Sequence, residues 1–282
     1  MALYVVDGTF ELFRCFHGAP RVKNASGREV GAVRGLAHTL ISLLRREDLT
    51  HVAVAFDSGV SRVRRGDMSP GALIRGQLPL ALDVCRALGI SVWPMKRCQA
   101  DDALASAAVR YRNEVERVVI CSSDKDFFQC IMGERVVVWN RITKKIMNET
   151  LLRNHYGVTP TQFPSFLALV GDPSDGIPGI PGFGRQTTAS ILDAFSRLED
   201  IPTDASRWPG VRGRRKLAQV YCERRQEALL YRELSTLRQD IPLVDRIEDL
   251  HWRGADRLAF SQLISDLSDD DLAKRTLHFR LS

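Results

Sequence analysis

Short apolar runs rich in β-branched residues alternate with helical patterns through the first 150 residues of the chain. The runs are apolar at successive positions, which indicates strands that are buried on both faces. Such strands, separated by helices, predict an α/β fold with a mostly parallel sheet flanked by helices. The predicted strands are 3–6, 52–56, 90–93, 118–121 and 136–139, and the predicted helices are 32–46, 78–88 and 103–111.

The pattern changes after about Thr150, where the strand signal fades. A loop punctuated by glycine and proline at 171–184 leads into a predicted helix at 186–195, and another helix is predicted at 220–237. We therefore expect a helical lobe to follow the α/β core. The expected parts are a core at 1–150, a helical lobe at 151–245 and a C-terminal segment at 246–282 that packs back on the core.

The composition excludes several classes of protein. A chain of 282 residues with 44% hydrophobic and 26% charged residues can bury a full core, which excludes collagen-like and disordered chains. No stretch approaches the length of an uncharged membrane span, and Asp7 interrupts the apolar run that a signal peptide needs. The 6 cysteines form no C-x-x-C pair and have no spaced His partner, so neither a zinc site nor a disulfide framework is indicated. We expect a cytoplasmic protein with reduced, mostly buried thiols.

Aspartates follow three of the predicted strands directly or within a few residues. Asp7 follows the first strand, Asp57 the second, and Asp124 and Asp126 the fourth. Ligands of open α/β sheets bind beyond the carboxyl ends of the strands, so we expect these side chains to share one crevice. Asp101 and Asp102 begin a predicted helix, and Asp172 and Asp175 lie in the later Gly/Pro loop at 171–184.

These carboxylates together favour metal-dependent chemistry. In one cleft they would repel one another by several kcal/mol unless cations neutralised them, and all-oxygen sites suit Mg²⁺ or Mn²⁺. Two such ions about 4 Å apart can bind the attacking and the leaving oxygen of a phosphodiester and lower the pKa of a bound water. The chain has no G-x-S-x-G elbow, Walker loop or evident Cys-His pair that would supply another chemistry.

Each acid also has a purely structural explanation. Asp101 and Asp102 suit the N-terminus of a helix, where the helix dipole favours negative charge. Asp57 precedes a Ser-Gly pair, and Asp172 and Asp175 lie in a Gly/Pro loop, so all three suit turns. Taken singly these explanations suffice, but together they do not explain why the acids fall where a parallel sheet would gather them.

Basic residues collect in two segments. The chain has 40 Lys+Arg against 34 Asp+Glu, a net charge of +6 that is compatible with a polyanionic partner. Both segments suit a solvated surface, and the segment 58–78 also suits a basic strap that guides single-stranded DNA over the crevice. The strap contains Arg62, Arg64, Arg65 and Arg75, and the second segment contains Arg207, Arg212, Arg214, Arg215, Lys216, Arg224 and Arg225 against the single acid Glu223.

A glycine-rich hairpin at 176–184 precedes the predicted helix 186–195. Its backbone N–H groups can face a phosphate at the helix N-terminus. Alone, such a turn is more often a tight connection between helices. Beside an acidic crevice it favours binding of duplex backbone without reading of bases.

As a set, these residues resemble the 5′ nuclease, or flap endonuclease, family, found as the N-terminal domain of bacterial DNA polymerase I and as stand-alone enzymes. The longest matching segment is the most specific to the family, and the end at Ser282 leads us to expect a stand-alone protein. The matching segments are YVVDGTFELFRCFHG, GAVRGLAHTL, HVAVAFD, QADDALA, SSDKDFFQ, LALVGDPSDGIPGIPGFGRQTTASIL and the ending LHFRL.

The resemblance implies a PIN-like nuclease core, a helix-hairpin-helix-type DNA-binding motif at 171–195 and hydrolysis of DNA near a 5′ end or at the base of a 5′ flap, in replication or repair. It implies two Mg²⁺ or Mn²⁺ ions and, in some members, a K⁺ ion at the hairpin. The implied ligands are Asp7, Asp57, Asp101 and Asp102 for the first metal and Asp124, Asp126, Asp172 and Asp175 for the second. The implied DNA-binding residues are Gly179, Gly182, Gly184, Arg185, Gln186 and Thr187, with Arg64, Arg65 and Arg75 in the strap.

Three departures from the family pattern leave alternatives open. Gln99 stands where the family usually has Glu, Gln186 replaces a usual Lys, and the strap is short and lacks the Tyr-Lys-Ala-Asn-Arg block. They favour, as a second hypothesis, a branched-DNA-binding protein with little or no catalysis. A third hypothesis, an RNA-directed nuclease, is disfavoured by the hairpin. The expected partners are DNA with 5′ flaps, overhangs or branches and a DNA polymerase acting in trans, and a monomer is expected.

Overall fold

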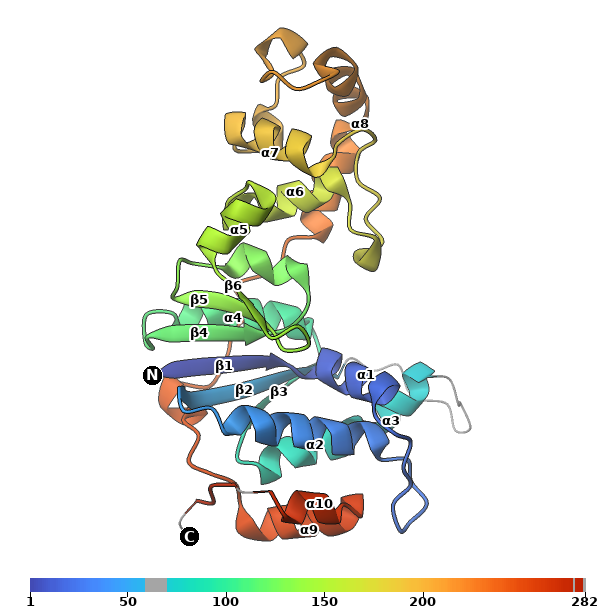
Figure 1. Ribbon diagram of the computed structural model, residues 1–282, viewed down its shortest axis with the longest axis vertical. Coiled ribbons are helices and arrows are strands. Elements are labelled where there is room, and N and C mark those ends of the chain that lie inside the picture. The colour runs from blue at the N-terminus through green and yellow to red at the C-terminus, as the bar shows by residue number, and fades with distance from the viewer. Residues whose placement is uncertain (59–69, 276, 281–282) are drawn as a thin grey trace. The chain divides into compact units, whose positions relative to one another are not determined.

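The computed structural model describes residues 1–58, 70–275 and 277–280 (Figure 1). Arg64 and Arg65 of the expected strap lie outside these residues. Within the described part of the chain, no helix is long and apolar enough to cross a membrane.

The chain forms two compact units, one made of Met1–Ser122 with Gln239–Ser282 and the other of Ser123–Arg238. The division expected from the sequence, at residues 150 and 245, stays a prediction. The compact units follow contacts: the segments after Ser122 pack on the helices that follow them, and residue 150 lies inside one of these helices.

The first unit is built on four parallel strands in the order β3-β2-β1-β4 (Figure 1). All six residues of β1 are buried, as expected for a central strand covered on both faces. Helix α4 contacts both β1 and β2, where small residues such as Ala103 and Ala107 allow close approach. The strands are β1 (Ala2–Asp7), β2 (Leu49–Asp57), β3 (Ser91–Met95) and β4 (Arg117–Cys121), and the helices are α1 (Gly8–Gly18), α2 (Gly31–Leu44), α3 (Pro70–Ala87) and α4 (Ala100–Tyr111).

The C-terminal segment packs on this same unit. Helix α9 (Arg257–Leu267) contacts α3, and the Trp252 indole donates a hydrogen bond to the Leu88 carbonyl at 2.9 Å. The short helix α10 (Asp270–Ala273) follows it. Just before α10, Asp269 is buried and accepts from the Arg34 guanidinium at 2.8 Å, which ties the segment to α2.

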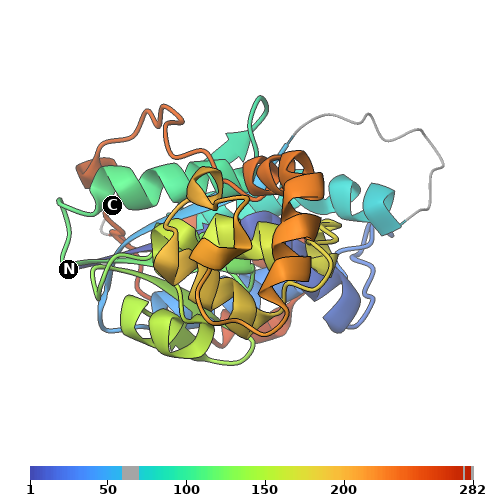
Figure 2. The ribbon, with the colours of Figure 1, turned by 90° about the horizontal axis from the view of Figure 1, so that it is seen from above.

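The second unit combines an antiparallel strand pair with a group of helices. Helices α7 and α8 both pack on α6 and lie beside it in two views (Figure 1, Figure 2). Phe128, Tyr156, Phe163 and Phe166 form an aromatic cluster with ring centroids 5.1–5.9 Å apart. The elements are the 3-10 helices η1 (Lys125–Cys130) and η3 (Pro173–Asp175), β5 (Val136–Asn140), β6 (Lys145–Met147), α5 (Glu149–Tyr156), α6 (Phe163–Val170), α7 (Arg185–Ala194) and α8 (Arg214–Leu234).

Several of these elements differ from the sequence expectation. Helix α8 begins at Arg214 rather than Val220, so most of the second basic segment is helical, with a kink at Arg224. Strand β6 and helices α1, α5, α6 and α9 were not predicted. The three residues of β6 are too few to show a period, and α5 is short and mostly exposed.

Candidate metal and DNA-binding sites

Asp7 lies at the carboxyl end of β1, where the polypeptide turns into α1. It is 5% exposed, and its Oδ1 accepts the Phe10 N–H at 2.8 Å, which caps the helix. Its Oδ2 accepts from the Ser122 hydroxyl at 3.1 Å, just beyond the end of β4. The side chain is therefore held at the sheet edge that the strand pattern predicts.

Asp57 ends the neighbouring strand β2 and contacts the start of α4. Its Oδ1 accepts the Ala100 N–H at 2.8 Å, and its own N–H donates to Thr9 Oγ1 at 2.8 Å. The first turn of α4 carries Asp101 and Asp102. Within the first unit, the structure thus brings Asp7, Asp57 and the two α4 aspartates to one edge of the sheet. Their role as metal ligands stays a prediction.

The acids of the second unit form a tight cluster. Asp124 caps η1 by accepting the Asp126 N–H at 2.8 Å, and Asp175 ends η3. One carboxylate oxygen from each of Asp124, Asp126 and Asp175 lies within 4.8 Å of the other two. Oδ1 of Asp126 is buried and has no hydrogen-bond partner within the described residues. A carboxylate accepts but cannot donate, so an unpartnered buried oxygen among other carboxylates fits a hard cation.

The pKa shifts of these aspartates also fit a cation at the cluster. Burial and the charges of Asp124 and Asp175 raise the pKa of Asp126 to about 8. Burial also raises the pKa of Asp124 and that of Asp175, and in both cases a neighbouring carboxylate adds to the effect. The cluster therefore holds more negative charge than its surroundings stabilise, which a divalent cation would relieve.

Asp172 is held differently from the other three acids of its unit. It is 1% exposed, and its Oδ2 lies 2.6 Å from the ammonium Nζ of Lys125. Its Oδ1 accepts the Ser174 N–H at 3.1 Å. Burial alone would raise the pKa of Asp172, but Lys125 and Ser174 hold it below its usual value. Asp172 is thus already engaged, and it is outside the group of three.

The glycine-rich hairpin adopts conformations that glycine favours. Gly176, Gly179 and Gly182 have φ of 70°, 73° and 89°. A Cβ on Gly179 would lie 2.6 Å from the backbone of Val170 and Gly171, so the hairpin closes tightly against the end of α6. Gly184 precedes α7 and has no side chain to cap it, which leaves the first N–H groups of the helix for another acceptor.

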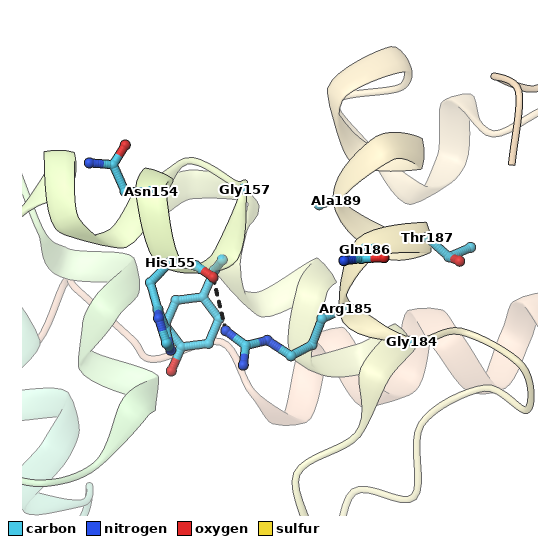
Figure 3. A pocket seen from close by; sticks show the side chains of 9 residues that line it. Asn154, His155, Gly157, Gly184, Arg185, Gln186, Thr187 and Ala189 are labelled. Carbon is cyan, nitrogen blue, oxygen red and sulfur yellow. Dashed lines mark hydrogen bonds between the residues drawn. The ribbon is translucent and has the colours of Figure 1, made fainter.

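An open pocket of about 780 Å³ lies beside the N-terminus of α7 (Figure 3). The guanidinium of Arg185 stacks over the Tyr156 ring at 4.8 Å and donates to the His155 carbonyl at 2.9 Å. Gln186 and Thr187 also line the pocket. His155 and Tyr156 were not predicted from the sequence, although Asn148 before α5 and Gly157 after it are a usual cap pair for a short helix.

Of the arginines expected in the strap, Arg75 lies within the described residues and is exposed on α3.

Comparisons with known proteins agree with this arrangement. The model of the N-terminal, resolvase-like domain of 5′-3′ exonucleases matches residues 2–157, and that of their C-terminal SAM fold matches residues 158–258. The chain is 33% identical to DNA polymerase I of Mycobacterium leprae, covering 99% of this chain and 31% of that protein. It is 25% identical to a 5′-3′ exonuclease of Buchnera aphidicola, covering 87% of this chain and 90% of that one. The chain thus spans about a third of the length of the polymerase relatives.

Solved structures with the same fold include a T5 5′-exonuclease and the catalytic core of Rad2. A T5 5′-exonuclease described with bound zinc has a TM-score of 0.64 at 20% identity, covering 97% of this chain and 96% of that one. The catalytic core of Rad2 in complex with a DNA substrate has a TM-score of 0.58 at 15% identity, covering 96% of this chain and 92% of that one. At these identities the likeness concerns the fold.

Proposed function

Because the chain belongs to the 5′-3′ exonuclease family, we propose that it hydrolyses DNA phosphodiester bonds near 5′ ends and at the base of 5′ flaps, using divalent metal ions. The observation that carries the proposal is the cluster of Asp124, Asp126 and Asp175 with its unpartnered buried oxygen. When bound, a divalent ion supplies Lewis-acid polarisation of a phosphodiester and lowers the pKa of a water.

In this proposal, different residues of the protein bind each metal ion. Asp124, Asp126 and Asp175 hold one Mg²⁺ or Mn²⁺ ion, and the acids at the edge of the first unit's sheet hold a second. All-carboxylate oxygen ligands support these metals over zinc or copper. No side chain is needed as a nucleophile, since the residues orient the scissile phosphate and the attacking water.

Substrate binding is assigned to the hairpin and the start of α7. Backbone N–H groups at an uncapped helix N-terminus bind phosphate oxygens irrespective of sequence, which suits a duplex of any sequence. Carbonyls of the hairpin are the proposed K⁺ ligands. A DNA polymerase acting in trans, a monomeric state and a cytoplasmic location complete the proposal, and each stays a prediction.

The test is cleavage of a 5′-labelled flap duplex and of a plain 5′ overhang, with Mg²⁺, Mn²⁺ or EDTA, resolved to single nucleotides. We expect metal-dependent products near the junction. Asp126→Asn should abolish them while sparing DNA binding. Asp83→Asn is the matched control, because that carboxylate is exposed on α3 and pairs with Arg86. Full activity of Asp126→Asn would contradict the proposal.

A second function is favoured by Gln99, which precedes α4 beside the first unit's acids. Its side chain is a neutral amide, so it adds no negative charge to a metal site there. This favours a branched-DNA-binding protein with little catalysis. Tight, salt-dependent binding of flaps without products in either metal would support this function instead.

A further inference from the structure

Gln129 lies in η1, and its side chain joins this 3-10 helix to the end of α8. Its Nε2 donates to the Asp126 carbonyl at 2.8 Å and to the Ser235 carbonyl at 2.9 Å, and its Oε1 accepts the Leu237 N–H at 3.0 Å. The residue is 9% exposed. One buried side chain thus connects two segments of the second unit that are far apart in sequence.

Glutamine suits this position because its amide group carries two N–H donors and a carbonyl acceptor. Nε2 faces two carbonyls and Oε1 faces an N–H, so the partners fix which way the amide points. Ser235 is the residue that ends α8, where the last carbonyls of a helix have no partner within the helix. A side chain without donors would leave these buried carbonyls without this partner, which is costly.

The backbone of Asp126 is held on both sides. Its N–H donates to Oδ1 of Asp124 at 2.8 Å, and its carbonyl accepts from Gln129. Asp126 contributes a carboxylate oxygen to the group with Asp124 and Asp175, in which these oxygens lie within 4.8 Å of one another. Because the backbone sets where a side chain begins, the place of the Asp126 carboxylate in this group depends on Gln129 and, through it, on the end of α8.

We propose that Gln129 is a positioning residue that, by joining the Asp126 carbonyl to the end of α8, keeps the Asp126 carboxylate where it can share a divalent cation with Asp124 and Asp175. The inference rests on the proposed function because it takes these three acids as metal ligands. Side chains that orient metal ligands without touching the ion change metal affinity by about 10- to 100-fold when they are replaced. Gln129 therefore contributes to metal affinity without being a ligand.

The test compares Gln129 with another glutamine of the same unit that holds backbone groups in a similar way. Gln162 is this matched control, because its Nε2 donates to the Leu192 carbonyl at 2.6 Å and its Oε1 accepts the Thr159 N–H at 2.9 Å. The full-length wild type, Gln129→Met and Gln162→Met are titrated with Mn²⁺ by calorimetry, and each is melted in EDTA. Methionine has a side chain of similar length but no N–H donor.

Both variants should melt earlier than the wild type, since each loses hydrogen bonds to the backbone. We expect Gln129→Met to bind Mn²⁺ more weakly by roughly tenfold or more, and Gln162→Met to bind it as the wild type does. A merely structural role of Gln129 would change the melting temperature alone. Wild-type Mn²⁺ affinity in Gln129→Met, or an equal loss of affinity in Gln162→Met, would overturn the inference.

The pair Gln129→Asn and Gln162→Asn gives the same comparison if a methionine variant does not fold. Asparagine keeps the amide group but is one methylene shorter, so at position 129 it cannot bond to both segments. We expect the same direction of change, with weaker Mn²⁺ binding at position 129 and wild-type binding at position 162. Equal Mn²⁺ affinity in the two asparagine variants would count against the inference.

The two proposals fail in different ways. If the wild type binds Mn²⁺ and Asp126→Asn does not, the metal site stands, and the Gln129 and Gln162 variants decide the inference alone. If the wild type shows no Mn²⁺ binding that depends on Asp126, the metal site is wrong and the inference is wrong with it.

Discussion

The aspartates of the second unit show how surroundings change the pKa of one residue type. Asp126 and Asp172 are both buried aspartates, but in the described part of the chain Asp172 forms an ion pair, with Lys125, and Asp126 forms none. The pKa of Asp126 is accordingly raised to about 8, by burial and by its acidic neighbours, whereas the pKa of Asp172 is lowered. Two aspartates of one unit thus differ in their surroundings: Oδ1 of Asp126 has no hydrogen-bond partner among the described residues, whereas Asp172 pairs with Lys125.

The raised pKa of Asp126 predicts a pH-dependent stability of the metal-free protein. Between about pH 4 and the folded pKa of about 8, the folded protein keeps a proton on Asp126 that the unfolded chain has lost. The folded state then binds more protons, so its stability falls as the pH rises through this window. Urea denaturation in EDTA at pH 5, 6.5 and 8 should show the decline, and Asp126→Asn should flatten it. An equal decline in both proteins would contradict the raised pKa.

The neutral side chain of Gln99 predicts that a single added negative charge at this position raises activity at low Mg²⁺. A carboxylate in place of its amide would add negative charge beside Asp57 and the first turn of α4. We expect Gln99→Glu to raise cleavage at low Mg²⁺ with little change at saturating Mg²⁺, because tighter metal binding matters only below saturation. The measurement is the Mg²⁺ dependence of flap cleavage, and an unchanged midpoint would show that Gln99 does not limit metal binding.

At the scale of elements, the glycine-rich hairpin is defined by close backbone approach. Its glycines differ in what surrounds them, since a Cβ on Gly176 would meet nothing within 4 Å, whereas one on Gly179 would meet backbone at 2.6 Å. Both have positive φ, so the conformational strain of a side chain is similar at the two positions. Alanine substitutions at Gly176 and Gly179 therefore distinguish the cost of backbone strain from the cost of a steric clash.

We expect Gly176→Ala to cost about 1 kcal/mol of unfolding free energy, from conformation alone. Gly179→Ala should cost roughly 3 kcal/mol or more, since the hairpin must also move away from the end of α6. Urea denaturation of both variants checks this. Equal losses would show that the hairpin is not closed as tightly as the structure places it.

At the scale of the whole molecule, acidic and basic side chains gather in different parts of the chain. In the second unit, exposed cations collect at the start of α8, where the helix dipole disfavours them and the first turn has no acid. A Cβ on Gly182 would lie 2.9 Å from Leu217, so this turn lies beside the hairpin. Cations kept at an unfavourable helix end, beside a proposed phosphate-binding loop, indicate a surface shaped for polyanions.

This surface predicts the salt dependence of DNA binding. Replacing Arg214 and Arg215 by Gln should reduce the slope of log affinity against log salt by about 0.9 for each DNA phosphate that these arginines neutralise. The matched control replaces Lys144 and Lys145, which are exposed on the β5–β6 connection and on β6 of the same unit. Fluorescence anisotropy with a duplex at several salt concentrations measures the slope. Equal slopes for the two double variants would remove α8 from the DNA surface.

The sequence by itself determined where the strands lie and that aspartates stand at their carboxyl ends. Apolar runs such as 3–6 and 118–121 are local patterns, and a carboxylate after a parallel strand has one edge of the sheet to occupy, so Asp7 and Asp57 lie where they were predicted. The hairpin was also readable, because positive φ leaves a local signature in glycine.

Only the tertiary structure decided how the second unit's acids differ. Lys125 and Asp172 are far apart in sequence, and no period or motif shows that an ion pair will join them. The same holds for β6, whose pairing with β5 depends on a partner strand rather than on its own three residues. Local patterns record which side of an element is buried, whereas pairing between distant side chains depends on packing that brings them within a few ångströms, and that information exists only in the folded chain.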